Sequence, residues 1–197
     1  MNHKVTAIIL AGGHSSRMEG EDKSLLPVEG KPLIQYITDQ MAGYFDEIII
    51  GSNFQAKYAF LGYPVIPDIE EGKGPLMGIV SCLKASKNEL NFVTACDIPD
   101  INMSLIFKMI SLAENNEIVM PVADTDKYEP LFALYKKSVI NYGELLLKNN
   151  KRSVLDLFTY VKPYFIDFKN EDWYRNLNYK KDYLDFIQKR YKSQNKG

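Results

Sequence analysis

A buried strand that runs directly into a glycine-rich loop constrains the fold of this chain more than any other feature. The apolar run Val5-Thr6-Ala7-Ile8-Ile9 leads into Leu10-Ala11-Gly12-Gly13, and Arg17 and Lys23 follow shortly afterwards. Two adjacent glycines let a ligand approach the backbone and permit the positive φ angles that point successive N–H groups at an anion. The segment therefore predicts a strand that ends in a phosphate-binding loop with two cations nearby.

This loop differs from the two common phosphate loops. It has neither the Gly-Lys-Ser/Thr ending of a Walker loop nor the third spaced glycine of a dinucleotide-binding fingerprint. A Gly-Gly pair after a strand is by itself often only a tight turn, so it is the spacing of Arg17 and Lys23 that favours nucleotide binding.

Strand and helix patterns alternate along the rest of the chain, without a low-complexity linker or an internal repeat. This alternation is typical of an α/β fold with a mostly parallel central sheet and helices on both faces. We predict a single domain over residues 1–191 and a polar tail over 192–197. The predicted strands are 5–10, 47–51, 64–66, 91–96, 117–121, 131–135 and 164–168, and the predicted helices are 32–41, 75–85, 103–113, 138–147, 153–158 and 181–191.

The charge balance favours a small anionic ligand over nucleic acid. The formal net charge is −1, whereas a general nucleic-acid binder normally carries a basic excess. No apolar run approaches the length that crosses a bilayer, and we expect neither a membrane nor nucleic acid as a partner. We expect a cytoplasmic protein whose two cysteines, Cys82 and Cys96, are free thiols of the core.

Several polar residues and one glycine fall where predicted strands end or helices begin. Asp97 ends a buried strand, and its hard oxygen ligands suit Mg²⁺ held together with substrate phosphates. Asp68 follows the strand 64–66 and is interpreted as a contact to a nucleotide ribose or base, as a residue that helps to order the metal, or as a solvated turn acid. Asn53 follows another strand at the same edge and is a candidate nucleotide-binding residue, although asparagine after a strand is also a common turn residue. Gly78 lies in a helix opening and permits close approach to a base.

Two groups in the last third of the chain are candidates for binding a second substrate. Lys151 and Arg152 precede a predicted helix, where positive charge opposes the helix dipole, so they favour an anionic ligand. Asn176 and Asn178 precede the last predicted helix, where Asn178 is alternatively a helix cap.

Taken together, these segments resemble the molybdenum cofactor guanylyltransferases over nearly the whole chain. The loop marks the wider nucleotidyltransferase superfamily, and the later motifs narrow the resemblance to this family. The sequence departs from the family pattern at Glu19 and at Tyr179-Lys180. The matching segments are Leu10-Ala11-Gly12-Gly13, Arg17-Met18, Asp22-Lys23, Gly30-Lys31-Pro32-Leu33, Asp68, Gly74-Pro75-Leu76-Met77-Gly78, Cys96-Asp97-Ile98-Pro99, Glu129-Pro130-Leu131-Phe132-Ala133-Leu134-Tyr135 and Asn176-Leu177-Asn178.

The resemblance implies a Rossmann-like domain that transfers GMP from GTP to molybdenum-bound molybdopterin and releases pyrophosphate. It implies that the amides of Leu10-Ala11-Gly12-Gly13 hold the triphosphate with Arg17 and Lys23, and that Asp97 holds Mg²⁺, or Mn²⁺ in its place. Arg17, Lys23 and Asp97 are then the catalytic residues. The implied partners are GTP, molybdopterin and, transiently, other molybdenum cofactor proteins.

Two other functions fit the same motifs. One is a related cytidylyltransferase that acts on molybdopterin or on a sugar or polyol phosphate. The other, from a different class, is a nucleotide-binding carrier that delivers the cofactor without catalysing transfer. Retention of both Lys23 and Asp97 speaks against the carrier, and nucleotide-dependent pyrophosphate release distinguishes all three.

Overall fold

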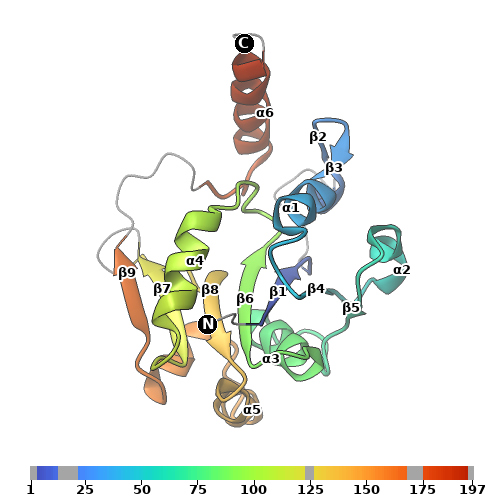
Figure 1. Cartoon of the computed structure of the whole chain (residues 1–197). Coiled ribbons are helices and arrows are strands. Elements are labelled where there is room, and N and C mark those ends of the chain that lie inside the picture. Colours follow the sequence, from blue (N-terminus) through green and yellow to red (C-terminus); the bar gives the residue numbers. More distant parts are fainter. Residues whose placement is uncertain (1–3, 13–21, 123–126, 168–174, 195–197) are drawn as a thin grey trace.

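A central β-sheet organises the molecule, which we describe from a computed structural model over residues 4–12, 22–122, 127–167 and 175–194 (Figure 1). Across these residues the sheet has seven strands in the order β5-β4-β1-β6-β8-β7-β9. The strands are β1 (Val5–Leu10), β4 (Glu47–Gly51), β5 (Val65–Ile66), β6 (Leu90–Ala95), β7 (Ile118–Val122), β8 (Phe132–Lys136) and β9 (Tyr164–Asp167).

The sheet is mostly parallel, as predicted, and β8 is its exception. β8 runs antiparallel to both β6 and β7, whereas the other neighbouring strands of this sheet pair in parallel. A short connection can join antiparallel neighbours, but parallel neighbours need a longer crossover. The segment between β7 and β8 holds no helix over its described residues, in keeping with this direct return.

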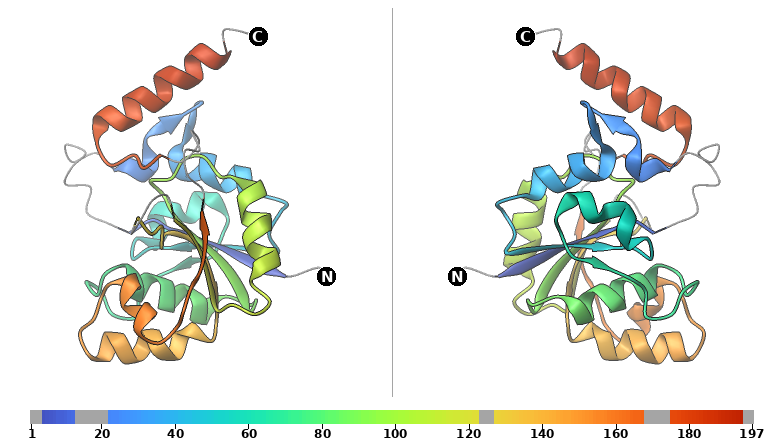
Figure 2. Two further views of the ribbon diagram at one scale, coloured as in Figure 1. Left: turned by 90° about the vertical axis from the view of Figure 1, so that its left-hand side faces the viewer. Right: turned by 90° about the vertical axis from the view of Figure 1, so that its right-hand side faces the viewer.

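Helices cover both faces of the sheet, which also confirms the prediction (Figure 2). The helices α1 (Leu33–Met41) and α4 (Met103–Leu112) pack on one face, and α3 (Pro75–Ala85) and α5 (Val139–Lys148) on the other. Within β1, the side chains of Ala7 and Ile9 pack in the core beneath α1 and α4, and the side chain of Ile8 packs in the core beneath α3 and α5. Because both faces are buried, this strand reads as an uninterrupted apolar run.

Some short elements and boundaries differ from the prediction. A hairpin of β2 (Pro27–Val28) and β3 (Lys31–Pro32) precedes α1, so Pro32 lies before that helix and not in its first turn. The segment predicted as a helix over 153–158 is a 3-10 helix, η3 (Val154–Thr159). The last helix, α6 (Lys180–Gln194), continues beyond its predicted end at Tyr191. The remaining short elements are η1 (Lys23–Leu25), α2 (Gln55–Tyr58) and η2 (Ala59–Leu61).

Arg190 fixes α6 to the rest of the molecule. Its guanidinium group forms ion pairs with Asp100 and, at 2.9 Å, with Glu29 in the β2-β3 turn. It also lies 4.8 Å from the ring centre of Tyr36 and 5.0 Å from that of Phe186. The helix is thereby joined to the hairpin and to the loop that follows β6, and Figure 2 shows it beside the hairpin.

We expect Arg190→Gln to lower the free energy of unfolding by about 1–2 kcal/mol, because it removes two partly exposed ion pairs and two cation–π contacts. Urea unfolding measures this change. Lys31→Gln is the matched control, since it removes an exposed pair with Asp39 and should cost under about 0.5 kcal/mol. Equal losses in the two variants would contradict the role given to Arg190.

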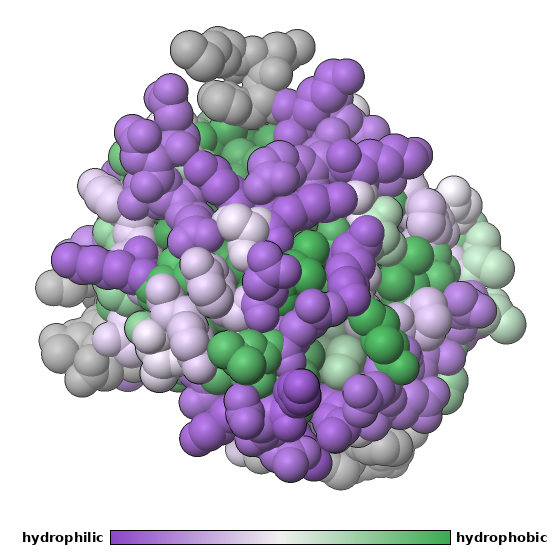
Figure 3. All heavy atoms as spheres, turned by 90° about the horizontal axis from the view of Figure 1, so that it is seen from below, coloured by the Kyte–Doolittle hydropathy of each residue, from purple (hydrophilic) through white to green (hydrophobic). Residues whose placement is uncertain are grey.

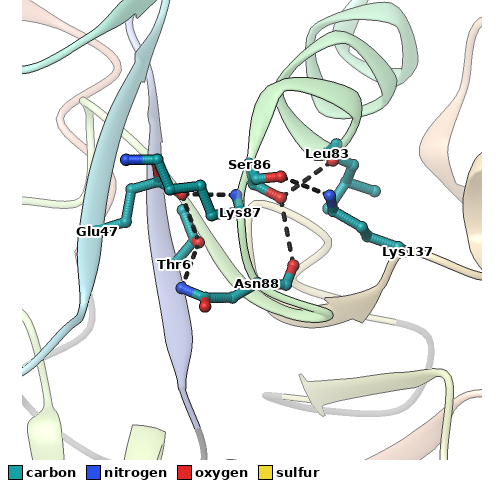
Figure 4. Close-up of polar contacts among 7 residues, drawn as sticks. All are labelled: Thr6, Glu47, Leu83, Ser86, Lys87, Asn88 and Lys137. Atoms are coloured by element: carbon teal, nitrogen blue, oxygen red, sulfur yellow. Dashed lines mark hydrogen bonds and ion pairs between the residues drawn. The ribbon is translucent and has the colours of Figure 1, made fainter.

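Hydrogen bonds link the residues at the amino-terminal ends of the strands to the loops around them (Figure 4). The Glu47 carboxylate accepts hydrogen bonds from Thr6 Oγ1 at 2.9 Å and from the Lys87 amide at 2.8 Å. Thr6 Oγ1 accepts in turn from Asn88 Nδ2 at 3.0 Å, and Lys137 Nζ donates to the Ser86 carbonyl. These hydrogen bonds join the start of β1 to the start of β4 and to the segment that precedes β6.

The face seen from below in Figure 3 lies on the α5 side of the molecule, and its hydrophobic residues form separate small patches among hydrophilic ones. Among the described helices, none is long and apolar enough to cross a membrane.

Candidate active site

The predicted nucleotide-binding residues share one position relative to the sheet. The last residues of four neighbouring parallel strands form a paired row, which is Ile66, Gly51, Leu10 and Ala95. Four predicted site residues lie two positions beyond this row: Asp68, Asn53, Gly12 and Asp97. β4 and β5 follow on one side of β1, and β6 lies on its other side, so the order of the strands reverses at β1. Open α/β sheets bind ligands at such switch points.

Lys23 and Asp97 meet at this edge. Lys23 Nζ lies 3.5 Å from Asp97 Oδ2, although 74 residues separate them in sequence. The two side chains are 16% and 28% exposed, so the pair is sheltered but still reachable. A distance of 3.5 Å is long for a charged hydrogen bond, so each group keeps bonding capacity for a ligand.

Asp68 and Asn53 form a second pair beside the first. The Asn53 side chain donates to Asp68 Oδ2 at 3.3 Å and accepts from the Asp68 amide at 2.7 Å. Burial raises the pKa of Asp68 above its usual range, the hydrogen bond from Asn53 opposes this rise, and the charge of Glu71 adds to it. A Cβ atom at Gly78 would lie 3.5 Å from Asp68 Oδ1. Three of the candidate nucleotide-binding residues, Asn53, Asp68 and Gly78, are therefore brought together.

The glycine loop departs in detail from the prediction. The Ala11 amide donates to the Gly51 carbonyl at 2.9 Å, so the sheet already uses it. Gly12 is exposed, a Cβ atom there would meet nothing within 4 Å, and its φ is not positive. Neither a left-handed backbone nor close packing therefore requires glycine at this position, and close approach of a ligand stays the predicted reason for it. Gly13, Arg17 and Glu19 lie outside the described residues.

The turn that carries Lys23 is held by Asp22 together with three residues that the sequence did not single out, Ser24, Lys57 and Tyr58. Asp22 caps η1 by accepting from the Ser24 amide at 3.1 Å and from the Ser24 hydroxyl at 2.7 Å. The Ser24 hydroxyl contacts the Tyr58 hydroxyl at 2.9 Å, and Lys57 Nζ pairs with Asp22. The only sequence signal for Lys57 and Tyr58 is that they follow Asn53 closely beyond the carboxyl end of β4.

The proposed second-substrate residues lie in two segments that contact different loops. Arg152 Nη1 donates to the Gly72 carbonyl at 3.2 Å, in the loop that leads into α3, while Lys151 is exposed nearby along the chain. The amide of Leu177, between the two predicted asparagines, donates to the Asp97 carbonyl at 2.8 Å. This last contact places the segment 176–178 at the Asp97 loop.

Asn178 lies just before the first turn of α6. Its amide and that of Tyr179 donate to Asp182 Oδ2 at 3.0 Å and 2.7 Å, so the described cap is a carboxylate inside the first turn. A carboxylate at this position satisfies free amides and favours the helix dipole.

The donor set at Asp97 fits Mg²⁺. Among the described residues there is no group of three or more His, Cys, Asp or Glu side chains that would enclose a metal ion. Mg²⁺ does not need one, because it commonly binds through one or two carboxylates together with substrate phosphates and water. Asp97 supplies an accessible carboxylate of this kind.

Comparison with known proteins identifies the family. The MobA-like NTP transferase domain matches residues 7–161. A probable molybdenum cofactor guanylyltransferase of Carboxydothermus hydrogenoformans is 35% identical over 188 residues, covering 91% of this chain and 93% of the relative. A protein with the same description from Clostridium perfringens is 36% identical over 95% of this chain and 98% of its own length.

A solved structure supports the fold. The molybdopterin-guanine dinucleotide biosynthesis protein A of Archaeoglobus fulgidus superposes with a TM-score of 0.78 at 20% sequence identity, covering 95% of this chain and 99% of that one. Together with the sequence matches, the aligned row of site residues leads to one conclusion. The chain is a nucleotidyltransferase and belongs to the MobA-like family of molybdenum cofactor guanylyltransferases.

Proposed function

We propose that this protein transfers GMP from GTP to molybdopterin, giving molybdopterin guanine dinucleotide and pyrophosphate. The observation that carries the proposal is the meeting of Lys23 and Asp97 at 3.5 Å at the carboxyl edge of the sheet. A cation for phosphate and a carboxylate for a divalent ion are the two charges that phosphoryl chemistry asks of a protein. The relatives, which carry the guanylyltransferase name over most of this length, support the identity of the nucleotide.

The proposed nucleotide position follows the row of site residues. The triphosphate lies over Gly12 and against Lys23, and the nucleoside lies toward Asn53, Asp68 and Gly78. The acceptor approaches from the Asp97 side, where the segment 176–178 contacts the loop after β6. Lys151 and Arg152 remain candidates for holding anionic groups of the acceptor.

The proposed reaction is an in-line displacement at the α-phosphorus of GTP. An oxygen of the terminal phosphate of molybdopterin forms the new P–O bond, and the bond to the bridging oxygen of the β-phosphate breaks, so pyrophosphate leaves with that electron pair. The attacking phosphate is already ionised at neutral pH, and no general base is needed. Lys23 stabilises the charge that grows on pyrophosphate, and positioning supplies much of the remaining rate.

Asp97 is the residue that we propose to hold Mg²⁺, or Mn²⁺, against the phosphates. The bound ion would supply charge neutralisation on the phosphate oxygens. Acceptor molybdopterin carries molybdenum in this proposal. We place the reaction in the cytoplasm, with transient contact to other molybdenum cofactor proteins. The two free cysteines agree with a reducing compartment.

The test is pyrophosphate release with GTP, CTP, ATP or UTP in the presence of molybdopterin and Mg²⁺. Release with GTP and formation of the guanine dinucleotide are expected. Release with CTP instead would favour the cytidylyltransferase. Tight GTP binding without release would favour the carrier, and release that ignores molybdopterin while depending on a sugar or polyol phosphate would identify another acceptor.

Gly78→Ala tests the nucleoside position. The new Cβ atom would be in ordinary contact with Asp68 and Leu10, both at 3.5 Å, so the fold should tolerate it. The methyl group fills the space where we place the nucleoside, and we expect the KM for GTP to rise about tenfold, the effect of modest overpacking. Steady-state kinetics measures this rise, and thermal unfolding of the same variant is the control. An unchanged KM would place the nucleoside elsewhere.

A further inference from the structure

Two consecutive residues of α2 hold both sequence neighbours of Lys23. Lys57 pairs with Asp22, and Tyr58 contacts Ser24 and, at 3.1 Å, the carbonyl oxygen of Ala11. Asp22 and Ser24 flank Lys23 in the sequence, and Ala11 lies at the other end of the glycine loop. One short helix therefore contacts both described ends of this loop, and neither residue figures in the reaction as proposed so far.

The Tyr58 hydroxyl is placed to fix these ends accurately. The side chain is fully buried, and burial raises the pKa of its phenol, so it stays protonated at neutral pH. Two hydroxyl protons serve three contacts, which link Ala11 O, Tyr58 OH, Ser24 Oγ and Asp22 Oδ1 in a chain. The Asp22 carboxylate attracts the Ser24 proton most strongly. The Tyr58 proton is then shared between Ser24 Oγ and the Ala11 carbonyl.

Lys57 adds an ion pair to the same turn. Its ammonium group pairs with Asp22 and lies 5.4 Å from the ring centre of Phe54 and 5.0 Å from that of Tyr58. Its side chain is 25% exposed, so the pair with Asp22 is less screened than a pair on the open surface. Asp22 thus binds the Ser24 amide through one oxygen and Lys57 through the other.

We propose that Tyr58 and Lys57 are positioning residues for Lys23, acting through Ser24 and Asp22 on the turn that carries it. This inference rests on the proposed function of Lys23 as the phosphate cation. A lysine side chain is long and loses much rotamer freedom when it is fixed. Holding the side chains of Asp22 and Ser24 on either side of Lys23 limits where its ammonium group can go, and a small displacement at a reacting centre has a large effect on rate.

The test is a double-mutant cycle that pairs Tyr58→Phe with Lys23→Ala. Tyr58→Phe keeps the ring in the core and removes only the hydroxyl. Two quantities are measured in all four proteins: affinity for inorganic pyrophosphate with Mg²⁺ by calorimetry, and kcat/KM for GTP. If Tyr58 acts through Lys23, Tyr58→Phe should lower both the pyrophosphate affinity and kcat/KM about tenfold in the wild-type background. In the Lys23→Ala background the same change should lower them less than about twofold.

Thr6→Val is the matched control. It also removes a buried hydroxyl with two hydrogen-bond partners, but at the opposite edge of the sheet (Figure 4). We expect it to lower the unfolding temperature without changing pyrophosphate affinity. Equal losses from Tyr58→Phe in both backgrounds, or no loss in the wild-type background, would overturn the inference.

Lys57→Met provides a second route should Tyr58→Phe fail to fold. It breaks the pair with Asp22 at a partly exposed position, and it should show the same dependence on Lys23. Pyrophosphate affinity also separates this inference from the proposed function. A protein that releases no pyrophosphate from GTP but keeps the coupling between positions 58 and 23 would refute the function alone, whereas GTP turnover without coupling would refute the inference alone.

Discussion

Asp97→Asn is expected to abolish metal-dependent turnover while leaving the fold intact. The amide has the same shape as the carboxylate, but it lacks the charge that would hold Mg²⁺. The structural contact of this residue with the C-terminal segment runs through its backbone carbonyl, which accepts from the Leu177 amide at 2.8 Å and is unaffected by the change. The rate of pyrophosphate release from GTP should therefore fall by about three orders of magnitude or more, at any Mg²⁺ concentration.

The measurement is a titration of the rate with Mg²⁺ and with Mn²⁺ for both proteins. Asp39→Asn is the control, because Asp39 is an exposed carboxylate on α1 that pairs with Lys31 of β3 and should be replaceable without effect on rate. Turnover near the wild-type rate in Asp97→Asn would show that another group holds the metal.

Much of this site followed from the sequence because parallel strands order their ends. Once Val5–Leu10 and Leu90–Ala95 are buried strands of one parallel sheet, the residues after them share an edge. That reasoning needs no knowledge of side-chain contacts, and it put Gly12 and Asp97 together. The pairing of Leu10 with Ala95 in the structure confirms the alignment of the two strand ends.

The residues that hold Lys23 in place could not be predicted in the same way. The helix α2 has only four residues, too few to show the apolar spacing by which longer helices are recognised. Tyr58 is one of thirteen tyrosines in the chain, and only the folded arrangement reveals that its hydroxyl reaches a turn 34 residues away. Contacts of this kind depend on tertiary structure and leave no local pattern.

The antiparallel strand β8 shows a related limit. Its sequence Phe132–Lys136 is as apolar as that of a parallel strand, because it too is buried on both faces. The direction of β8 in the sheet is set by its connections and by its pairing with β6 and β7, which the residue pattern does not encode.

The four second-substrate candidates come from two separate segments of the chain, and their described contacts do not test the role predicted for them. The four candidates were grouped because both pairs precede helices late in the chain. The described contacts instead join Arg152 to Gly72, in the loop before α3, and Leu177 to Asp97. Their shared role in binding the acceptor therefore remains a prediction that the contacts themselves do not require.

Lys23→Ala is expected to cost about 2–4 kcal/mol of transition-state stabilisation, the usual loss when one preorganised charge partner is removed from a sheltered site. Lys23 is only 16% exposed, so water replaces its charge poorly. Its partner Asp97 would lose a cation at 3.5 Å, but η1 would keep its cap, since Asp22 binds the backbone and hydroxyl of Ser24. The effect should therefore fall on the chemistry and not on folding.

The division of this loss between kcat and KM decides what Lys23 does. Charge grows on pyrophosphate as the bond to the α-phosphorus breaks, so a cation that serves the leaving group is worth more in the transition state than in bound GTP. We expect kcat to fall by about 30-fold to 1000-fold while the KM for GTP changes little. Single-turnover rates at saturating GTP measure the chemical step directly. An unchanged rate with a raised KM would mean that Lys23 only binds GTP in the ground state, and the leaving-group charge would then have to be met by other residues at the edge of the sheet.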